Sequence, residues 1–207
     1  MTPLREKYEV LHADYKQIVN IIEPKSKVLD LGCGSGELLA VLRDTKHVTG
    51  SGIEIDEEYV IACIKKGLSV IQGNLDDGLP EYQDKSYDYT ILNLTLQVVR
   101  NPLLVLNEML RVGQKAIVSF PNFGHWIVRY KYFFSGKMPK SRQLPFEWYN
   151  TPNIRLLTFK DFRAFCKQNN ITILKEIPLL SADREPGYFP HCLANLLAEE
   201  GLFILTK

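Results

Sequence analysis

A glycine-rich turn near the N-terminus carries the clearest chemistry in the sequence. Gly32, Gly34 and Gly36 alternate between a short apolar run and a stretch with helical spacing. Glycines in such a turn let the backbone approach a ligand closely. Two carboxylates flank the turn: Asp30 precedes it, and Glu37 stands where a dinucleotide fingerprint would have its third glycine. Because these charges would repel a pyrophosphate and complement a cation, the pattern favours a ligand with adenosine and a positive group. It disfavours a dinucleotide-dependent oxidoreductase.

A third carboxylate, Glu54, lies roughly 20 residues after Gly32, at the end of the next apolar run. A carboxylate in that place can accept hydrogen bonds from both hydroxyls of a ribose. Asp56 is better explained as the N-cap of a following helix, whose first turn holds Glu57 and Glu58. The sequence therefore predicts a site for S-adenosylmethionine and its product S-adenosylhomocysteine, with Glu54 and not Asp56 on the ribose.

The ends of the next two expected strands add polar groups. Asn74 and the Leu75 amide have the acceptor and the donor that adenine needs, and an ordinary turn explains them equally well. Asn93 follows the fourth apolar run, where it would face the transferred methyl group. A core or capping role explains Asn93 equally well.

Short β-branched runs alternate with stretches of helical spacing, which predicts one doubly wound α/β domain over residues 1–207. The expected strands cover 27–31, 48–55, 69–72, 87–92, 115–120, 171–177 and 202–205. The expected helices cover 5–22, 37–43, 57–66, 103–110 and 160–169. A loop through Pro186 and Pro190 precedes the last strand.

An aromatic, proline-containing segment, residues 121–157, interrupts the alternation. We call it the insert, and insertions of this length are usually functional. His125 is the first candidate for a general base, because imidazole titrates near neutral pH, and Tyr149 is a weaker one. A hydrogen-bonded histidine that fixes the insert explains His125 better than a base does, and packing within the insert explains Tyr149 better than a substrate cage does.

Residues 109–146 contain no Asp or Glu. Their basic residues are Arg111, Lys115, Arg129, Lys131, Lys137, Lys140 and Arg142. Such a run is either a solvated face or a surface for an anionic substrate or an acidic protein.

Composition excludes several classes of protein. With 45% hydrophobic and 24% charged residues, the chain is ordinary globular sequence, and its net charge of +1 disfavours a nucleic-acid partner. No apolar run is long enough for a membrane span. Cys33, Cys63, Cys166 and Cys192 are scattered, which predicts no metal site and a reduced, cytoplasmic protein.

Five motifs together resemble the class I S-adenosylmethionine-dependent methyltransferases and, more narrowly, the methionine biosynthesis protein MetW family. They are GCGSGELL at 32–39, GIEID at 52–56, TLQ at 95–97, FPNFGHW at 120–126 and EWYNTPNI at 147–154. Many relatives have Asp at the position of Asn74, whose amide oxygen still accepts a hydrogen bond but without charge assistance.

The resemblance implies a Rossmann-like, seven-stranded, mostly parallel sheet with an antiparallel last strand. It also implies a cytoplasmic protein of methionine biosynthesis that associates with homoserine O-acyltransferase. Two functions stay open: methyl transfer to a small-molecule substrate, and a non-catalytic role in which the protein senses S-adenosylmethionine and regulates the acyltransferase.

Overall fold

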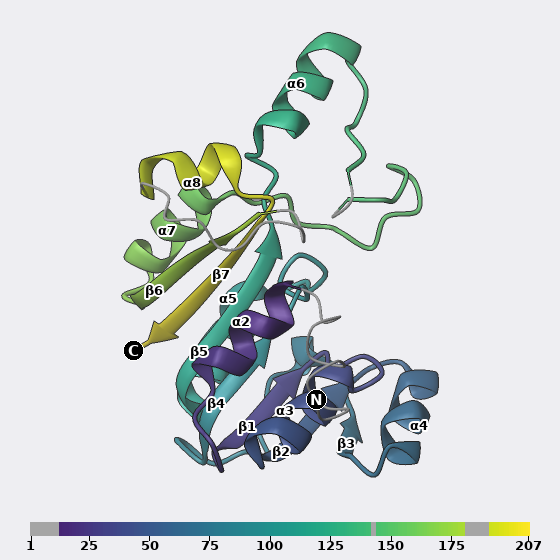
Figure 1. Cartoon of the computed structure of the whole chain (residues 1–207), viewed down its shortest axis with the longest axis vertical. Coiled ribbons are helices and arrows are strands. Elements are labelled where there is room, and N and C mark those ends of the chain that lie inside the picture. Colours follow the sequence, from purple (N-terminus) through teal and green to yellow (C-terminus); the bar gives the residue numbers. More distant parts are fainter. Residues whose placement is uncertain (1–12, 142–143, 181–190) are drawn as a thin grey trace, which may run out of the picture.

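The computed structural model describes residues 13–141, 144–180 and 191–207 (Figure 1). Their centre is a seven-stranded sheet of order β3-β2-β1-β4-β5-β7-β6. The strands are β1 (Lys27–Leu31), β2 (Thr49–Glu54), β3 (Ser69–Gln72), β4 (Tyr87–Leu92), β5 (Gly113–Pro121), β6 (Thr172–Leu179) and β7 (Glu200–Thr206). The first five pair in parallel, and β7 runs antiparallel to both of its neighbours. This confirms the expected mostly parallel sheet with an antiparallel last strand.

The helices are α2 (Ala13–Ile21), α3 (Glu37–Lys46), α4 (Glu57–Lys65), the 3-10 turn η1 (Leu75–Asp77), α5 (Pro102–Val112), α6 (Trp126–Ser135), α7 (Phe159–Gln168) and α8 (His191–Leu197). Helices α2 to α5 and α7 correspond to the five helices that the periodicity predicts, whereas α6 and α8 were not predicted. Of the helix expected over 5–22, residues 13–21 are helical and 5–12 lie outside the described residues. The loop through Pro186 and Pro190, and Arg142, also lie outside them.

Two apolar layers cover the two faces of the sheet. Successive side chains of a strand point to opposite faces, so each central strand contributes to both layers. One layer joins α2 and α3 to Val28, Ile91 and Ile117. The other joins α5 and α7 to Leu29, Leu92 and Val118. Burial on both faces explains the continuous apolar runs from which these strands were predicted.

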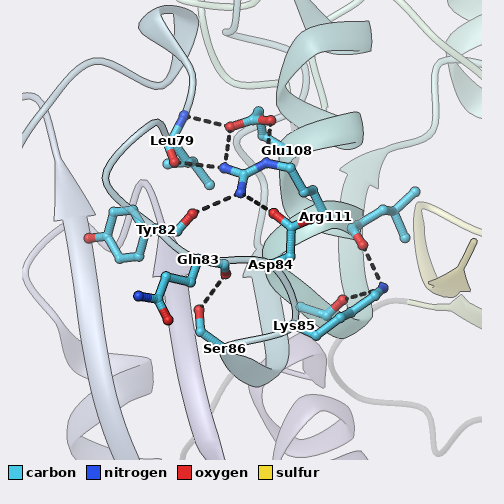
Figure 2. Close-up of polar contacts among 10 residues, drawn as sticks. Leu79, Tyr82, Gln83, Asp84, Lys85, Ser86, Glu108 and Arg111 are labelled. Atoms are coloured by element: carbon cyan, nitrogen blue, oxygen red, sulfur yellow. Dashed lines mark hydrogen bonds and ion pairs between the residues drawn. The ribbon is translucent and has the colours of Figure 1, made fainter.

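Arg111 on α5 holds the segment between η1 and β4 in place (Figure 2). Its guanidinium donates to the backbone oxygens of Leu79 at 2.8 Å and Tyr82 at 2.7 Å, and pairs with Asp84 at 2.7 Å. It also pairs with Glu108, whose carboxylate accepts from the Leu79 N–H at 2.9 Å. Since η1 directly precedes this segment, the Arg111 contacts fix the polypeptide that leads away from η1.

The insert forms one helix, α6, and an irregular return. Figure 1 shows α6 projecting beyond the end of β5, away from the sheet. Asn122 anchors its base: the side-chain N–H groups donate to the backbone oxygens of Asn195 at 3.2 Å and Ala198 at 2.7 Å. The Phe123 N–H donates to the Leu157 oxygen at 3.1 Å, which joins the two ends of the insert. The insert is therefore tied down at its base.

Candidate functional site

A cavity of about 390 Å³ lies at the carboxyl ends of β1, β2 and β4. Gly32, Glu54, Asn74, Leu75 and Thr95 are among its lining residues. The strand order reverses between β1 and β4, and ligands of open α/β sheets bind at such a switch point. The structure thus brings four of the residues predicted for a cofactor to one cavity.

The turn after β1 has the backbone that its glycines predict. Gly32 has φ 73°, and a Cβ added there would lie 2.7 Å from Thr95 Cγ2. Gly36 is the N-cap of α3 in the left-handed conformation. The N–H groups of Gly32 and Cys33 both donate to the Ile53 oxygen, at 2.8 and 3.2 Å. These bonds place the turn against the end of β2.

Glu54 is buried, and its carboxylate organises the backbone around it. Oε2 accepts from the Gly34 N–H at 2.8 Å, and Oε1 accepts from the N–H groups of Ile55 at 2.8 Å and Asp56 at 3.0 Å. A carboxylate has about four acceptor positions, so one position on Oε2 is left for a ligand. Accepting both ribose hydroxyls would require one backbone N–H to give way. Asp56 caps α4 by accepting from the Glu58 and Tyr59 N–H groups, as expected.

Asp30 is a buried carboxyl group beneath the glycine turn. Burial and, to a lesser extent, the nearby charge of Glu54 together raise its pKa to about 7. Tyr15 of α2 lies close by: burial raises the pKa of its hydroxyl, and the charge of Asp30 adds to this. Among the described residues, no ion pair includes Asp30 or Glu54. These buried acidic groups are therefore not neutralised by an ion pair, and a positively charged ligand would complement them. Arg100 is the one basic residue among the described residues that line the cavity.

Asn74 and Leu75 directly follow β3 and line the cavity together with Thr95. The Asn74 side-chain oxygen accepts from the Asp76 N–H at 3.1 Å and so caps η1. Asp76, which the sequence analysis did not single out, accepts from the N–H groups of Arg100 at 3.1 Å and Asn101 at 2.7 Å. These bonds tie η1 to the start of α5 and close this side of the cavity.

Asn93 does not line the cavity. Its side-chain N–H donates to Asp14 on α2 at 2.8 Å, and its oxygen accepts from the Ser119 hydroxyl at 2.6 Å. The amide of Asn93 therefore joins three elements, as a core residue would.

The two candidate bases lie outside the cavity as well. His125 is buried and lines a separate space of about 170 Å³ beside Glu199. Burial lowers the pKa of its imidazole, and the Glu199 carboxylate offsets part of this. Tyr149 is 70% exposed, with its ring against Trp148. Neither residue meets the other predicted site residues in this structure.

In residues 13–141, 144–180 and 191–207, no three His, Cys, Asp or Glu side chains group as metal ligands would. No helix in the same part of the chain has the length and apolar character that crossing a membrane requires.

The strand order, the antiparallel β7 and the cavity at the switch point define a class I methyltransferase fold. A similar structure is that of a S-adenosylmethionine-dependent methyltransferase from Archaeoglobus fulgidus, with TM-score 0.69 and 13% identity over 97% of this chain and 94% of that one. Another is the [4+2]-cyclase SpnF, with TM-score 0.65 and 13% identity over 93% of this chain and 80% of that one. The fold therefore accommodates more than one reaction.

The chain belongs to the MetW family: the model of methionine biosynthesis protein MetW matches residues 12–205. This confirms the resemblance seen in the five motifs. The chain is also 43% identical over 176 residues to the bifunctional methionine biosynthesis protein MetXA/MetW of Rhodopirellula baltica. That match covers 81% of this chain but only 28% of the relative.

Proposed function

We propose that this protein binds S-adenosylmethionine in the cavity beside the glycine turn and transfers its methyl group to a small molecule of methionine metabolism in the cytoplasm. The observation that carries the proposal is the pair of buried carboxyl groups, Asp30 and Glu54, which lie beside a glycine turn and take part in no ion pair among the described residues. Burying a charge without a partner is costly, and a cationic ligand removes that cost.

The residues present fit this ligand. Glu54 has an acceptor position left for a ribose hydroxyl, and the absence of a side chain at Gly32 keeps the turn open to the cavity. Asn74 and Leu75 line the cavity and would bind adenine. Asp30, buried beneath the turn, would complement the positive end of the ligand. When bound, S-adenosylmethionine supplies an electrophilic methyl group on its sulfonium.

Methyl transfer depends mainly on how the acceptor is positioned, and a base helps only where the acceptor must lose a proton. The cavity therefore supports the proposal without a catalytic triad. His125 and Tyr149 stay predictions as bases, because neither lines the cavity.

The test is calorimetric titration with S-adenosylmethionine and S-adenosylhomocysteine, followed by incubation with methyl-labelled cofactor and a small-molecule extract. We expect binding and a labelled product. Absence of binding by the wild-type protein would overturn the proposal, and so would tighter binding of a nicotinamide dinucleotide than of S-adenosylhomocysteine. Binding without any labelled product would favour the second function below.

A second function is that of a non-catalytic partner, which senses S-adenosylmethionine and regulates homoserine O-acyltransferase. The observation that favours it is the Rhodopirellula baltica relative, whose single chain is described as both MetXA and MetW. A contact between the cavity and the insert supports this regulatory role. The backbone oxygen of Gln97, in the loop that lines the cavity, accepts from the backbone N–H groups of Ile154 and Arg155, each at 3.0 Å. The deciding measurement is the acyltransferase rate with and without this protein, at several cofactor concentrations. An unchanged rate and no complex would exclude this role.

A further inference from the structure

The outer surface of α6 exposes large aromatic side chains. Phe133 is 81% exposed and Phe134 69%, and Tyr130 and Tyr132 are also more than half exposed. The rings of Tyr130 and Phe134 are 4.6 Å apart, and those of Phe133 and Phe134 are 5.0 Å apart. We call Tyr130, Phe133 and Phe134 the aromatic face. Single exposed apolar side chains are normal, whereas a contiguous group marks an interaction site.

The aromatic face is not explained by packing within the chain. Val128 is the one residue of α6 that is buried. Figure 1 shows the helix standing clear of the sheet and of the helices that cover it. Most helical stability in proteins comes from burying an apolar face. A helix of this composition with so little burial therefore indicates a surface that a partner covers.

The base of α6 is held in a defined orientation. The Arg129 side chain donates to the Gly124 oxygen at 2.6 Å, and the Gly124 N–H donates to the Asn122 side-chain oxygen at 2.9 Å. On the far side, Lys131 donates to the Lys140 oxygen at 2.8 Å, and Lys140 pairs with Glu147. A surface presented in one orientation loses less entropy on binding.

The charges of α6 favour an acidic partner. Arg129 and Lys131 lie on the helix and Lys137 follows it, and all three are exposed. The basic run of residues 109–146 does not form a single surface, since Arg111 is held at Glu108 and Lys115 pairs with Glu23 at 3.6 Å. Aromatic and Arg side chains are enriched at the centres of protein interfaces, where charged partners set specificity.

We infer that the aromatic face of α6 is the surface through which this protein docks on homoserine O-acyltransferase, in an apolar depression bordered by acidic side chains. The inference rests on the second proposed function. The relative named MetXA/MetW favours a protein over a membrane as the occupant, because it joins a unit of this family to another biosynthetic unit in one chain. The Tyr130 hydroxyl also suits a protein partner, which can offer it a hydrogen bond.

The test measures binding of the full-length protein to purified homoserine O-acyltransferase from the same organism. We expect the double variant Phe133→Ser/Phe134→Ser to weaken binding at least about 100-fold, as expected for two central interface residues. The matched control Ile61→Ser/Ile64→Ser changes two exposed apolar residues of α4, at the opposite end of the molecule from α6 in Figure 1, and should leave binding unchanged. Lys137→Glu should slow association, most strongly at low salt.

The outcomes separate the surface from the function. Failure of the wild-type protein to bind the acyltransferase overturns both the inference and the second proposed function. Wild-type binding that survives in the double variant overturns the surface alone. Binding of S-adenosylmethionine by the double variant would show that the variant is folded. If the double variant does not fold, the single variant Phe133→Ser should still weaken docking at least about tenfold.

Two other occupants would also overturn the inference. One is an anionic lipid surface, shown by sedimentation of the wild-type protein with phosphatidylserine vesicles and loss of sedimentation in the double variant. The other is a second copy of the chain, shown by a dimer that the double variant abolishes while acyltransferase binding persists.

Discussion

The Glu54 carboxylate and the Gly34 backbone N–H lie 2.8 Å apart, so the end of β2 holds the glycine turn that follows β1. Glu54, the residue proposed to bind the ribose, is thus also a structural part of the turn. Its two other bonds, to the N–H groups of Ile55 and Asp56, fix the chain that leads into α4. A change at Glu54 therefore alters the shape of the cavity as well as its chemistry.

Replacing Glu54 with Gln should weaken S-adenosylmethionine binding at least tenfold. The NH₂ of the amide must face either the Gly34 N–H or the N–H groups of Ile55 and Asp56, and it leaves those donors unpaired. A lost hydrogen bond to a charged group costs about 1.5–3 kcal/mol. Calorimetric titration measures the effect. The control Glu57→Gln, on the exposed start of α4, should bind like the wild type. Equal affinity of the Glu54 variant and the wild type would contradict the role of Glu54.

The pKa of Asp30 predicts how stability depends on pH. It rises from 3.8 to about 7 because the group is buried and lies near Glu54. Between these values the folded protein holds a proton that the unfolded chain has released, so this contribution to the free energy of unfolding decreases as pH rises from about 4 to about 7. Urea unfolding across this range should show that the free energy of unfolding of the wild type decreases relative to that of Asp30→Asn as the pH rises. A constant difference would show that Asp30 does not titrate there.

The same group predicts how ligand binding depends on pH. A cationic ligand favours the ionised form of Asp30, so the affinity for S-adenosylmethionine should increase as pH rises from 6 to 8, with protons released on binding. Titration in buffers of different ionisation enthalpy measures the released protons. Asp30→Asn should remove this release, and a release that persists in the variant would assign it to another group.

A Cβ at Gly32 should disturb the turn through Thr95. In Gly32→Ala the new atom would lie 2.7 Å from Thr95 Cγ2 and 2.9 Å from Thr95 Oγ1, at a φ of 73° that L-residues adopt with strain. The additional change Thr95→Ala removes both contacting atoms. The double variant should therefore be more stable, by about 1 kcal/mol, than the sum of the single effects predicts. Additive effects in a double-mutant cycle of thermal or urea unfolding would contradict this contact.

Arg111→Lys should destabilise the protein although the charge remains. A lysine cannot reproduce the planar fork that reaches Leu79, Tyr82 and Glu108 together. We expect a loss of about 2 kcal/mol. At roughly 2–4 °C per kcal/mol for a chain of this size, the Tm should fall by about 4–8 °C in calorimetry. Arg43→Lys, at a more exposed ion pair, serves as the control and should change little. A Tm within about 1 °C of the wild type would show that the Arg111 contacts do not contribute to stability.

The sheet and the position of the cavity were predictable because their signals are local. Strand, turn and helix around Gly32 follow from apolar runs, glycine spacing and the placement of Asp30, all within about a dozen residues. The alternation of runs determines a parallel sheet, whose strand ends then gather Glu54, Asn74 and Leu75. Asp56 was predicted as a helix cap for the same reason, since capping depends on the next three residues.

What only the tertiary structure decided depends on partners that are distant in sequence. Asn93 is engaged by Asp14 from α2 and Ser119 from β5, and no pattern near Asn93 indicates either contact. His125 lies beside Glu199 because β7 inserts next to β5, and the burial that lowers its pKa is set by the same packing. The aromatic face has a composition that would equally suit a core helix. Its exposure follows from the direction in which the insert leaves β5, which the Asn122 contacts to the α8 region determine. The sequence by itself determined the fold and the end of the sheet at which the cavity lies, because local patterns encode elements and their caps. Packing between distant elements decided which side chains remain free to meet a ligand or a partner.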